Sequence, residues 1–183
     1  MNLLLQLQDD GALIPLGRIA AGEKGTAQTV AALWAVVKES AATPAVRTLA
    51  RQIGSPTQLY HWIKAHSVFA PDPRGREVIR VPEMLIRQVR RGGITGKYRG
   101  DCDDTAALGC AILAAMGKTP VVSTVGATPR EAGGRFQHIF FGYAAPEIVS
   151  GVVLMDPQEG YPPNTFPAFP LAKLWWADGE HAA

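Results

Sequence analysis

Cys102 is the residue best placed for covalent chemistry, because it lies in the segment Gly100-Asp101-Cys102-Asp103-Asp104. A cysteine attacks an amide carbonyl only as a thiolate, so it requires a positive local field, a nearby base and some exposure. Asp101 is a natural N-cap and Asp104 can complete a reciprocal capping box, which predicts Cys102 in the first turn of a helix. The backbone N–H groups of that turn favour a thiolate and can hold an oxyanion.

The carboxylates beside Cys102 oppose thiolate formation, because nearby negative charge raises the pKa of a thiol. A helix terminus contributes about 0.3 to 1 kcal/mol at an exposed site. A paired imidazolium is far stronger and lowers a thiol pKa from about 8.5 to about 3 or 4. A histidine must therefore supply most of the activation.

His138 is the histidine best suited to this role. It is expected mid-strand in the apolar run 136–143, on the face shared with Phe136 and Phe140, where a polar group requires a partner. Asp156 ends the next apolar run, and antiparallel pairing would bring its carboxylate to the imidazole and fix the tautomer. The other histidines are expected on a helix surface or in the C-terminal tail: His61, His66 and His181.

The oxyanion site is only partly defined by the sequence. The backbone N–H of Cys102 is the expected first donor, and the second is left open among Tyr98, Trp62 and Gln137.

No metal or cofactor is expected. Zinc favours paired ligands at short spacing, and His61 and His66 are five residues apart instead of the four that share a helix face. A calcium loop beginning at Asp101 would need glycine at Ala106 and glutamate at Ile112.

Apolar periodicity predicts helices first and strands last, which defines an α+β fold. Short connections between the strands favour antiparallel pairing, so the N-terminal helices and a central helix would pack on an antiparallel sheet. The expected helices cover residues 26–39, 44–53, 57–65, 82–91 and the central 103–116, and the expected strands cover 119–125, 136–143 and 152–156.

A chain of 183 residues, 47% of them hydrophobic, is long enough for one well-cored domain. We expect an N-terminal hairpin or arm at 1–22, the domain at 23–176 and a tail at 177–183, with Trp175 and Trp176 packing the chain end onto the body. No secretory signal or membrane span is apparent.

The two cysteines are expected to be free thiols. On one helix, Cys102 and Cys110 would have Cα atoms roughly 12 Å apart, beyond the limit of about 7 Å for a disulfide. Cys110 lies in an apolar helix and is expected in the core. Free thiols suit a reducing compartment, so a cytoplasmic location is expected.

Several motifs in order resemble the transglutaminase-like superfamily, and specifically its small bacterial and phage-associated members. The resemblance covers about residues 26–157 and rests on these segments: Trp62, Phe69-Ala70-Pro71-Asp72-Pro73, Glu77-Val78, Val81-Pro82-Glu83, Gly100-Asp101-Cys102-Asp103-Asp104, Met116-Gly117, His138 and Leu154-Met155-Asp156-Pro157. It implies a papain-related core with Cys102 as nucleophile, His138 as general base and acid, and Asp156 as the residue that orients it.

The expected activity is that of a cysteine peptidase or amidase acting on a peptide or protein through an acyl-thioester. The alternatives are an amine acyltransferase of the transglutaminase type and a non-catalytic phage assembly or interaction protein that retains the fold, in which case a phage or host protein would be the partner and the protein could be virion-associated. Nucleic acid is not the expected partner, because the net charge is only +2 and a solvated surface accounts for the basic residues before Cys102. These residues are Arg87, Arg90, Arg91, Lys97 and Arg99.

Overall fold

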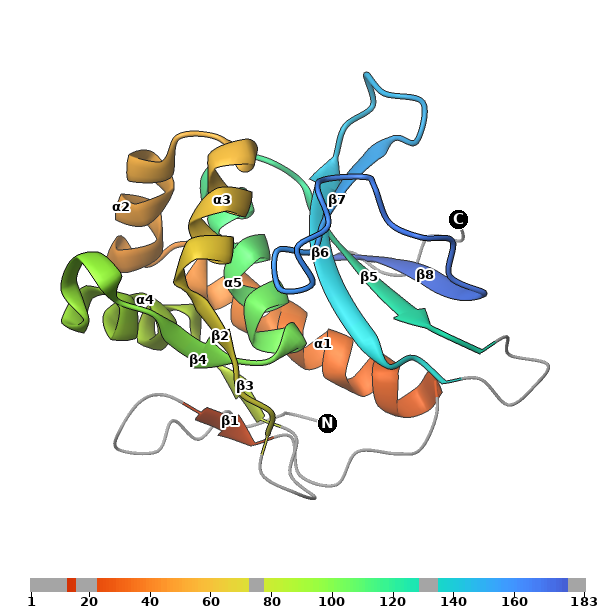
Figure 1. Ribbon diagram of the computed structural model, residues 1–183, viewed down its shortest axis with the longest axis horizontal. Coiled ribbons are helices and arrows are strands. Elements are labelled where there is room, and N and C mark those ends of the chain that lie inside the picture. The colour runs from red at the N-terminus through yellow and green to blue at the C-terminus, as the bar shows by residue number, and fades with distance from the viewer. Residues whose placement is uncertain (1–12, 16–22, 73–77, 129–134, 178–183) are drawn as a thin grey trace.

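The structure is a computed structural model that describes residues 13–15, 23–72, 78–128 and 135–177. It has a helical side and a sheet side, with one central helix between them (Figure 1). The helices are α1 (Glu23–Ser40), α2 (Pro44–Ile53), α3 (Pro56–His66), α4 (Pro82–Arg91), the 3₁₀ turn η1 (Gly93–Thr95) and the central α5 (Cys102–Ala115). The predicted α+β fold is confirmed.

Local sequence signals explain where the helices begin and end. Pro44 and Pro82 occupy the first helical position, where the missing N–H costs nothing. Gly54 stops α2 in the left-handed conformation, with φ of 79°. The predicted bounds of 44–53 and 82–91 are therefore found residue for residue, whereas α1 begins three residues before its predicted start of 26.

The main sheet has the strand order β7-β6-β5-β8, and all its neighbours are antiparallel. Its strands are β5 (Pro120–Gly126), β6 (His138–Ala144), β7 (Val152–Met155) and β8 (Leu171–Trp176). Strand β8 is an addition to the predicted set. The buried Trp175 anchors it by donating from its indole N–H to Thr124 Oγ1 at 2.8 Å, which confirms the predicted packing of the chain end.

Short strands also pair between distant parts of the chain. The parallel pair joins β2 (Ser67–Phe69) to β4 (Tyr98–Gly100), and the antiparallel pair joins β1 (Leu13–Pro15) to β3 (Val78–Arg80). These pairs were not predicted. Residues 1–12 and 16–22 of the expected arm, and 178–183 of the expected tail, lie outside the described residues.

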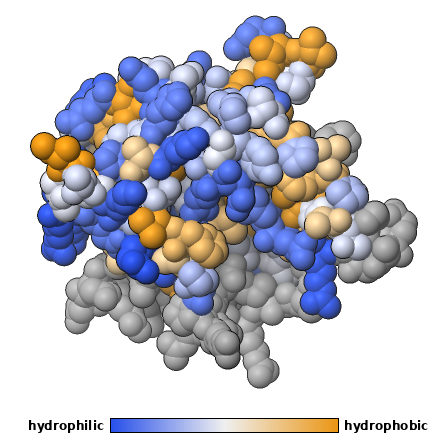
Figure 2. All heavy atoms as spheres, in the orientation of Figure 1, coloured by the Kyte–Doolittle hydropathy of each residue, from blue (hydrophilic) through white to orange (hydrophobic). Residues whose placement is uncertain are grey.

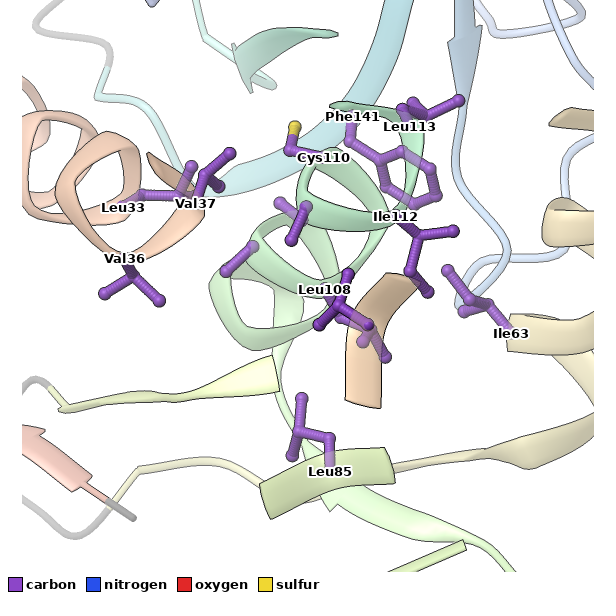
Figure 3. Packing of buried hydrophobic residues seen from close by; sticks show 14 of the residues in the cluster. Leu33, Val36, Val37, Ile63, Leu85, Leu108, Cys110, Ile112, Leu113 and Phe141 are labelled. Atoms are coloured by element: carbon purple, nitrogen blue, oxygen red, sulfur yellow. The ribbon is translucent and has the colours of Figure 1, made fainter. Parts of the chain in front are cut away.

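Helix α5 is the centre of the hydrophobic core. Every residue from Asp103 to Leu113 is buried, because helices cover one side of α5 and β6 covers the other. Figure 3 shows side chains from both sides meeting around α5, with Leu33 and Val37 of α1 on one flank and Phe141 of β6 on another. The polar residues of this apolar helix are gathered in its first turn, at Asp103, Asp104 and Thr105, next to the partly exposed Cys102.

The surface is mainly hydrophilic over the helical side (Figure 2). Hydrophobic residues reach the surface at the tip of the connection between β6 and β7, where Val149 is fully exposed. No helix in the described ranges combines the length and apolarity that a membrane crossing requires.

Candidate active site

Cys102 is the first residue of α5, as the sequence predicts, and its N-cap is Asp101. The reciprocal capping box is present, and in it the N–H of Asp101 donates to Asp104 Oδ2 at 3.2 Å. Gly100 must be a glycine here, because a Cβ at this position would come within 2.7 Å of the same Asp104 oxygen. The capping box therefore fixes how the chain enters the helix at the thiol.

The two thiols have different surroundings. Both cysteines are free, as predicted, but Cys102 is partly exposed and Cys110 is buried in the core. Burial raises the pKa of the Cys110 thiol well above its ordinary value. Only Cys102 combines a helix N-terminus with solvent access.

The pKa of Cys102 is raised from its ordinary value of 9.0 to about 12. Burial is the largest cause, and the charge of Asp103 adds to it, with a smaller addition from Asp101. The main-chain N–H groups of Ile139 and of Cys102 itself act in the opposite direction by favouring the thiolate. The expected effect of the carboxylates is thus present, and a thiol with this pKa is protonated at neutral pH.

His138 and Asp156 form the predicted hydrogen bond. Nε2 of His138 lies 2.6 Å from Asp156 Oδ2, and the carboxylate is buried while the ring is partly exposed. Because an ionised carboxylate only accepts, this bond holds the proton on Nε2 and leaves Nδ1 as the free acceptor. The geometry therefore selects the tautomer that a general base requires.

The sheet register explains why these side chains meet. Strands β6 and β7 pair with Phe141 opposite Met155, so continuing the register by one residue brings Asp156 opposite Phe140. His138 is two residues from Phe140 on the same face, and their ring centroids are 5.8 Å apart. His138 begins β6 instead of lying mid-strand, and Asp156 follows β7 in an isolated bridge with Tyr161.

Cys102 lies beside this strand without being bonded to the imidazole. The thiol is close enough to β6 for the N–H of Ile139, the residue after His138, to lower its pKa. In the described part of the chain, no hydrogen bond joins the thiol to the His138 ring. Hydrogen bonds between a nucleophile and its base are often long or poorly aligned in ligand-free enzymes and tighten when substrate binds.

Arg80 balances part of the negative charge around Cys102. Its guanidinium pairs with both Asp104 and Asp72, and its main-chain N–H donates to Asp104 Oδ1 at 2.6 Å. Burial is the largest influence on the pKa of Asp104 and raises it, while the bonds from Arg80 lower it. No sequence signal pointed to Arg80, because its buried partner Asp104 is 24 residues further along the chain.

The candidate second oxyanion donors have other contacts. Tyr98 is fully buried, its hydroxyl lies 3.1 Å from Thr105 Oγ1, and burial raises its pKa strongly. Gln137 accepts from the N–H of Ala127 through its side-chain oxygen at 3.2 Å. The Trp62 ring packs on His66 with centroids 4.8 Å apart. None of these contacts directs a donor at Cys102.

The other histidines lie away from this chemistry. His61 is exposed on α3, as expected. His66 is half-buried instead of lying on the surface, and its Nδ1 is 2.7 Å from the carbonyl oxygen of Gly96. His181 lies outside the described residues.

The acidic residues around Cys102 are the only metal-ligand cluster in the described residues. Ligand atoms of Asp101, Asp103 and Asp104 all lie within 4.8 Å of one another. The Asp104 carboxylate, however, already accepts from Arg80 and from the N–H of Asp101. A cation would have to compete with the half-buried Arg80 guanidinium for the Asp104 carboxylate.

The fold has a solved counterpart. The sequence matches no protein-family model, and no curated protein matches it. A crystal structure of a candidate protease from Parabacteroides distasonis resembles this chain with a TM-score of 0.55 and 16% sequence identity, over 83% of this chain and 29% of that one. This chain therefore spans less than a third of that protein, and at this identity the likeness establishes a shared fold.

Proposed function

We propose that this protein is a cysteine-dependent amide hydrolase, a peptidase or amidase, with Cys102 as nucleophile, His138 as general base and acid, and Asp156 as the residue that orients His138. The observation that carries the proposal is the 2.6 Å bond from His138 to the buried Asp156, next to a helix that begins with Cys102. This combination and the motif order support membership of the transglutaminase-like superfamily. The shared fold with a candidate protease agrees with it.

The reaction begins with proton transfer from the Cys102 thiol to Nδ1 of His138, because Asp156 already engages Nε2. The sulfur attacks the amide carbonyl carbon, and the resulting oxyanion is held by the N–H of Cys102 at the start of α5. His138 returns its proton to the leaving amine as the C–N bond breaks, which leaves a thioester. Water, deprotonated by His138, then releases the acid and restores the thiol.

The raised pKa of Cys102 makes His138 indispensable in this scheme. With a pKa of about 12, the thiol alone would supply a thiolate fraction of about 10⁻⁵ at pH 7. Coupling the attack to proton transfer from the thiol to the His138 ring removes this limit.

Hydrolysis is proposed over acyl transfer, because no described residue marks a site for an amine acceptor. The substrate would be a peptide or protein. If the site is inert, the remaining reading is the non-catalytic phage assembly or interaction protein, for which a phage or host protein is the partner.

Acylation by p-nitrophenyl acetate tests the proposal directly. The wild-type chain should gain one acetyl group on Cys102, seen by intact-protein and peptide mass spectrometry, and lose it by hydrolysis at pH 7. Cys110→Ala is the matched control and should behave as wild type, whereas Cys102→Ala should not be acetylated. If the acetyl group passes to added methylamine in preference to water, the activity is that of an acyltransferase and the hydrolase proposal is rejected. Acetylation that does not depend on His138 would refute the triad.

A further inference from the structure

Gln158 connects the two halves of the proposed site. It lies two residues after Asp156 in the turn that follows β7, and its side-chain Nε2 donates to the carbonyl oxygen of Gly100 at 3.3 Å. Gly100 is two residues before Cys102. One half-buried side chain thus joins the segment that orients His138 to the segment that leads into the nucleophile.

The turn that carries Gln158 is held firmly at its other contacts. The N–H of Glu159 donates to Asp156 Oδ1 at 3.3 Å, and the N–H of Gly160 donates to the Asp156 carbonyl at 3.1 Å. Tyr60 on α3 donates its hydroxyl to the Gly160 carbonyl at 3.1 Å. These bonds make the turn a rigid unit with Asp156, so a contact between the turn and the segment leading into α5 acts on Asp156 as well.

The acceptor on the nucleophile side is also fixed. The Gly100 carbonyl ends β4 and accepts a second bond from the N–H of Ala70 at 2.9 Å. Gly100 is packed against the Asp104 carboxylate of the capping box. The bond from Gln158 therefore ends on a part of the chain that cannot move independently of Cys102.

We propose that Gln158 is a positioning residue, which sets the distance between the His138–Asp156 pair and Cys102 by binding the Gly100 carbonyl. This inference rests on the proposed function and adds a residue to it. Its physical basis is that proton transfer between sulfur and imidazole is steeply sensitive to distance, and a displacement of about 1 Å can cost about 100-fold in rate. Without the bond, the sheet ladder and the core would still hold the fold.

Alkylation of Cys102 by iodoacetamide, followed at pH 7 and at pH 10, separates this role from a structural one. Gln158→Met keeps the length of the side chain and removes the donor. We expect at least a 10-fold loss of rate at pH 7, where reaction depends on His138. At pH 10 we expect a clearly smaller loss, because with a thiol pKa of about 12 the unassisted thiolate fraction is about 1000-fold larger than at pH 7. The ratio of the two rates is the readout.

Gln88→Met is the matched control. Gln88 also binds the main chain of β4, accepting from the N–H of Arg99 at 2.9 Å, and within the described residues no hydrogen bond joins it to the turn after β7. It should leave the rate ratio unchanged. The melting temperature of each variant reports the structural cost separately.

The alkylation rates distinguish the failure of the Gln158 proposal from the failure of the triad. A Gln158→Met protein with the wild-type rate ratio overturns the positioning role and leaves the triad intact. A wild-type protein that shows no His138-dependent alkylation at pH 7 overturns the triad itself. Equal losses at pH 7 and pH 10 would assign Gln158 a general structural role and likewise reject the proposal.

Discussion

Replacing His138 by alanine should remove the reactivity of Cys102 at neutral pH, and the size of the effect follows from the surroundings of the thiol. Burial, Asp103 and Asp101 raise the Cys102 pKa from 9.0 to about 12, and none of these influences is removed together with the His138 ring. Because the pKa of the thiol is raised, Cys102 holds less thiolate than an ordinary cysteine at every pH below about 12. At pH 7 the thiolate fraction of Cys102 is therefore about 10⁻⁵, against about 10⁻² for a thiol with the ordinary pKa of 9.0.

Nucleophilicity recovers part of this loss. A thiolate of higher pKa reacts faster, with a Brønsted coefficient of about 0.4 to 0.5, which returns about 20-fold over three pKa units. His138→Ala should therefore react about 50-fold more slowly at pH 7 than an ordinary thiol such as N-acetylcysteine amide. The wild-type protein should react at least as fast as that reference.

The assay is the rate of Cys102 alkylation by iodoacetamide between pH 5 and pH 11, measured by peptide mass spectrometry. His61→Ala is the matched control, because His61 is an exposed histidine on α3, and it should leave the profile unchanged. Wild-type reactivity that rises only above pH 9, or a His138→Ala profile that coincides with the wild type at pH 7, would refute the reasoning.

Further predictions follow from individual contacts. Asp156→Asn should cost about 10⁴-fold in acylation rate, because its amide N–H would favour the wrong tautomer of the His138 ring; p-nitrophenyl acetate kinetics with thermal melting as the fold control would measure this. Arg80→Met should lower the free energy of unfolding by about 3 to 5 kcal/mol, because Asp104 is left buried without its cation. That loss should shrink in urea titrations as the pH falls, since protonation removes the uncompensated charge. Gly109→Ala should destabilise by about 1 to 3 kcal/mol despite its better helix propensity, because the new methyl meets the Phe141 ring; Phe141→Leu in the same chain should recover part of the loss.

The sequence predicted the local features of the site well, because each depends on neighbouring residues. Asp101 and Asp104 form a capping box three residues apart, which placed Cys102 at the helix start. Proline at the first position and glycine after the last fixed the ends of α2 at 44 and 53. Apolar runs with short connections predicted the antiparallel pairing that brings Asp156 to His138.

The tertiary structure decided the features that depend on residues far apart in the chain. The parallel pairing of Ser67–Phe69 with Tyr98–Gly100 has no local signature, because each strand is short and gains its stability only from its partner. The pairing of Arg80 with Asp104 and the bond from Gln158 to Gly100 likewise join distant segments. The protonation state of Cys102 also depends on the tertiary structure. The signs of the charges around the thiol can be read from the sequence, but the burial that dominates its pKa arises only when α5 packs against the sheet.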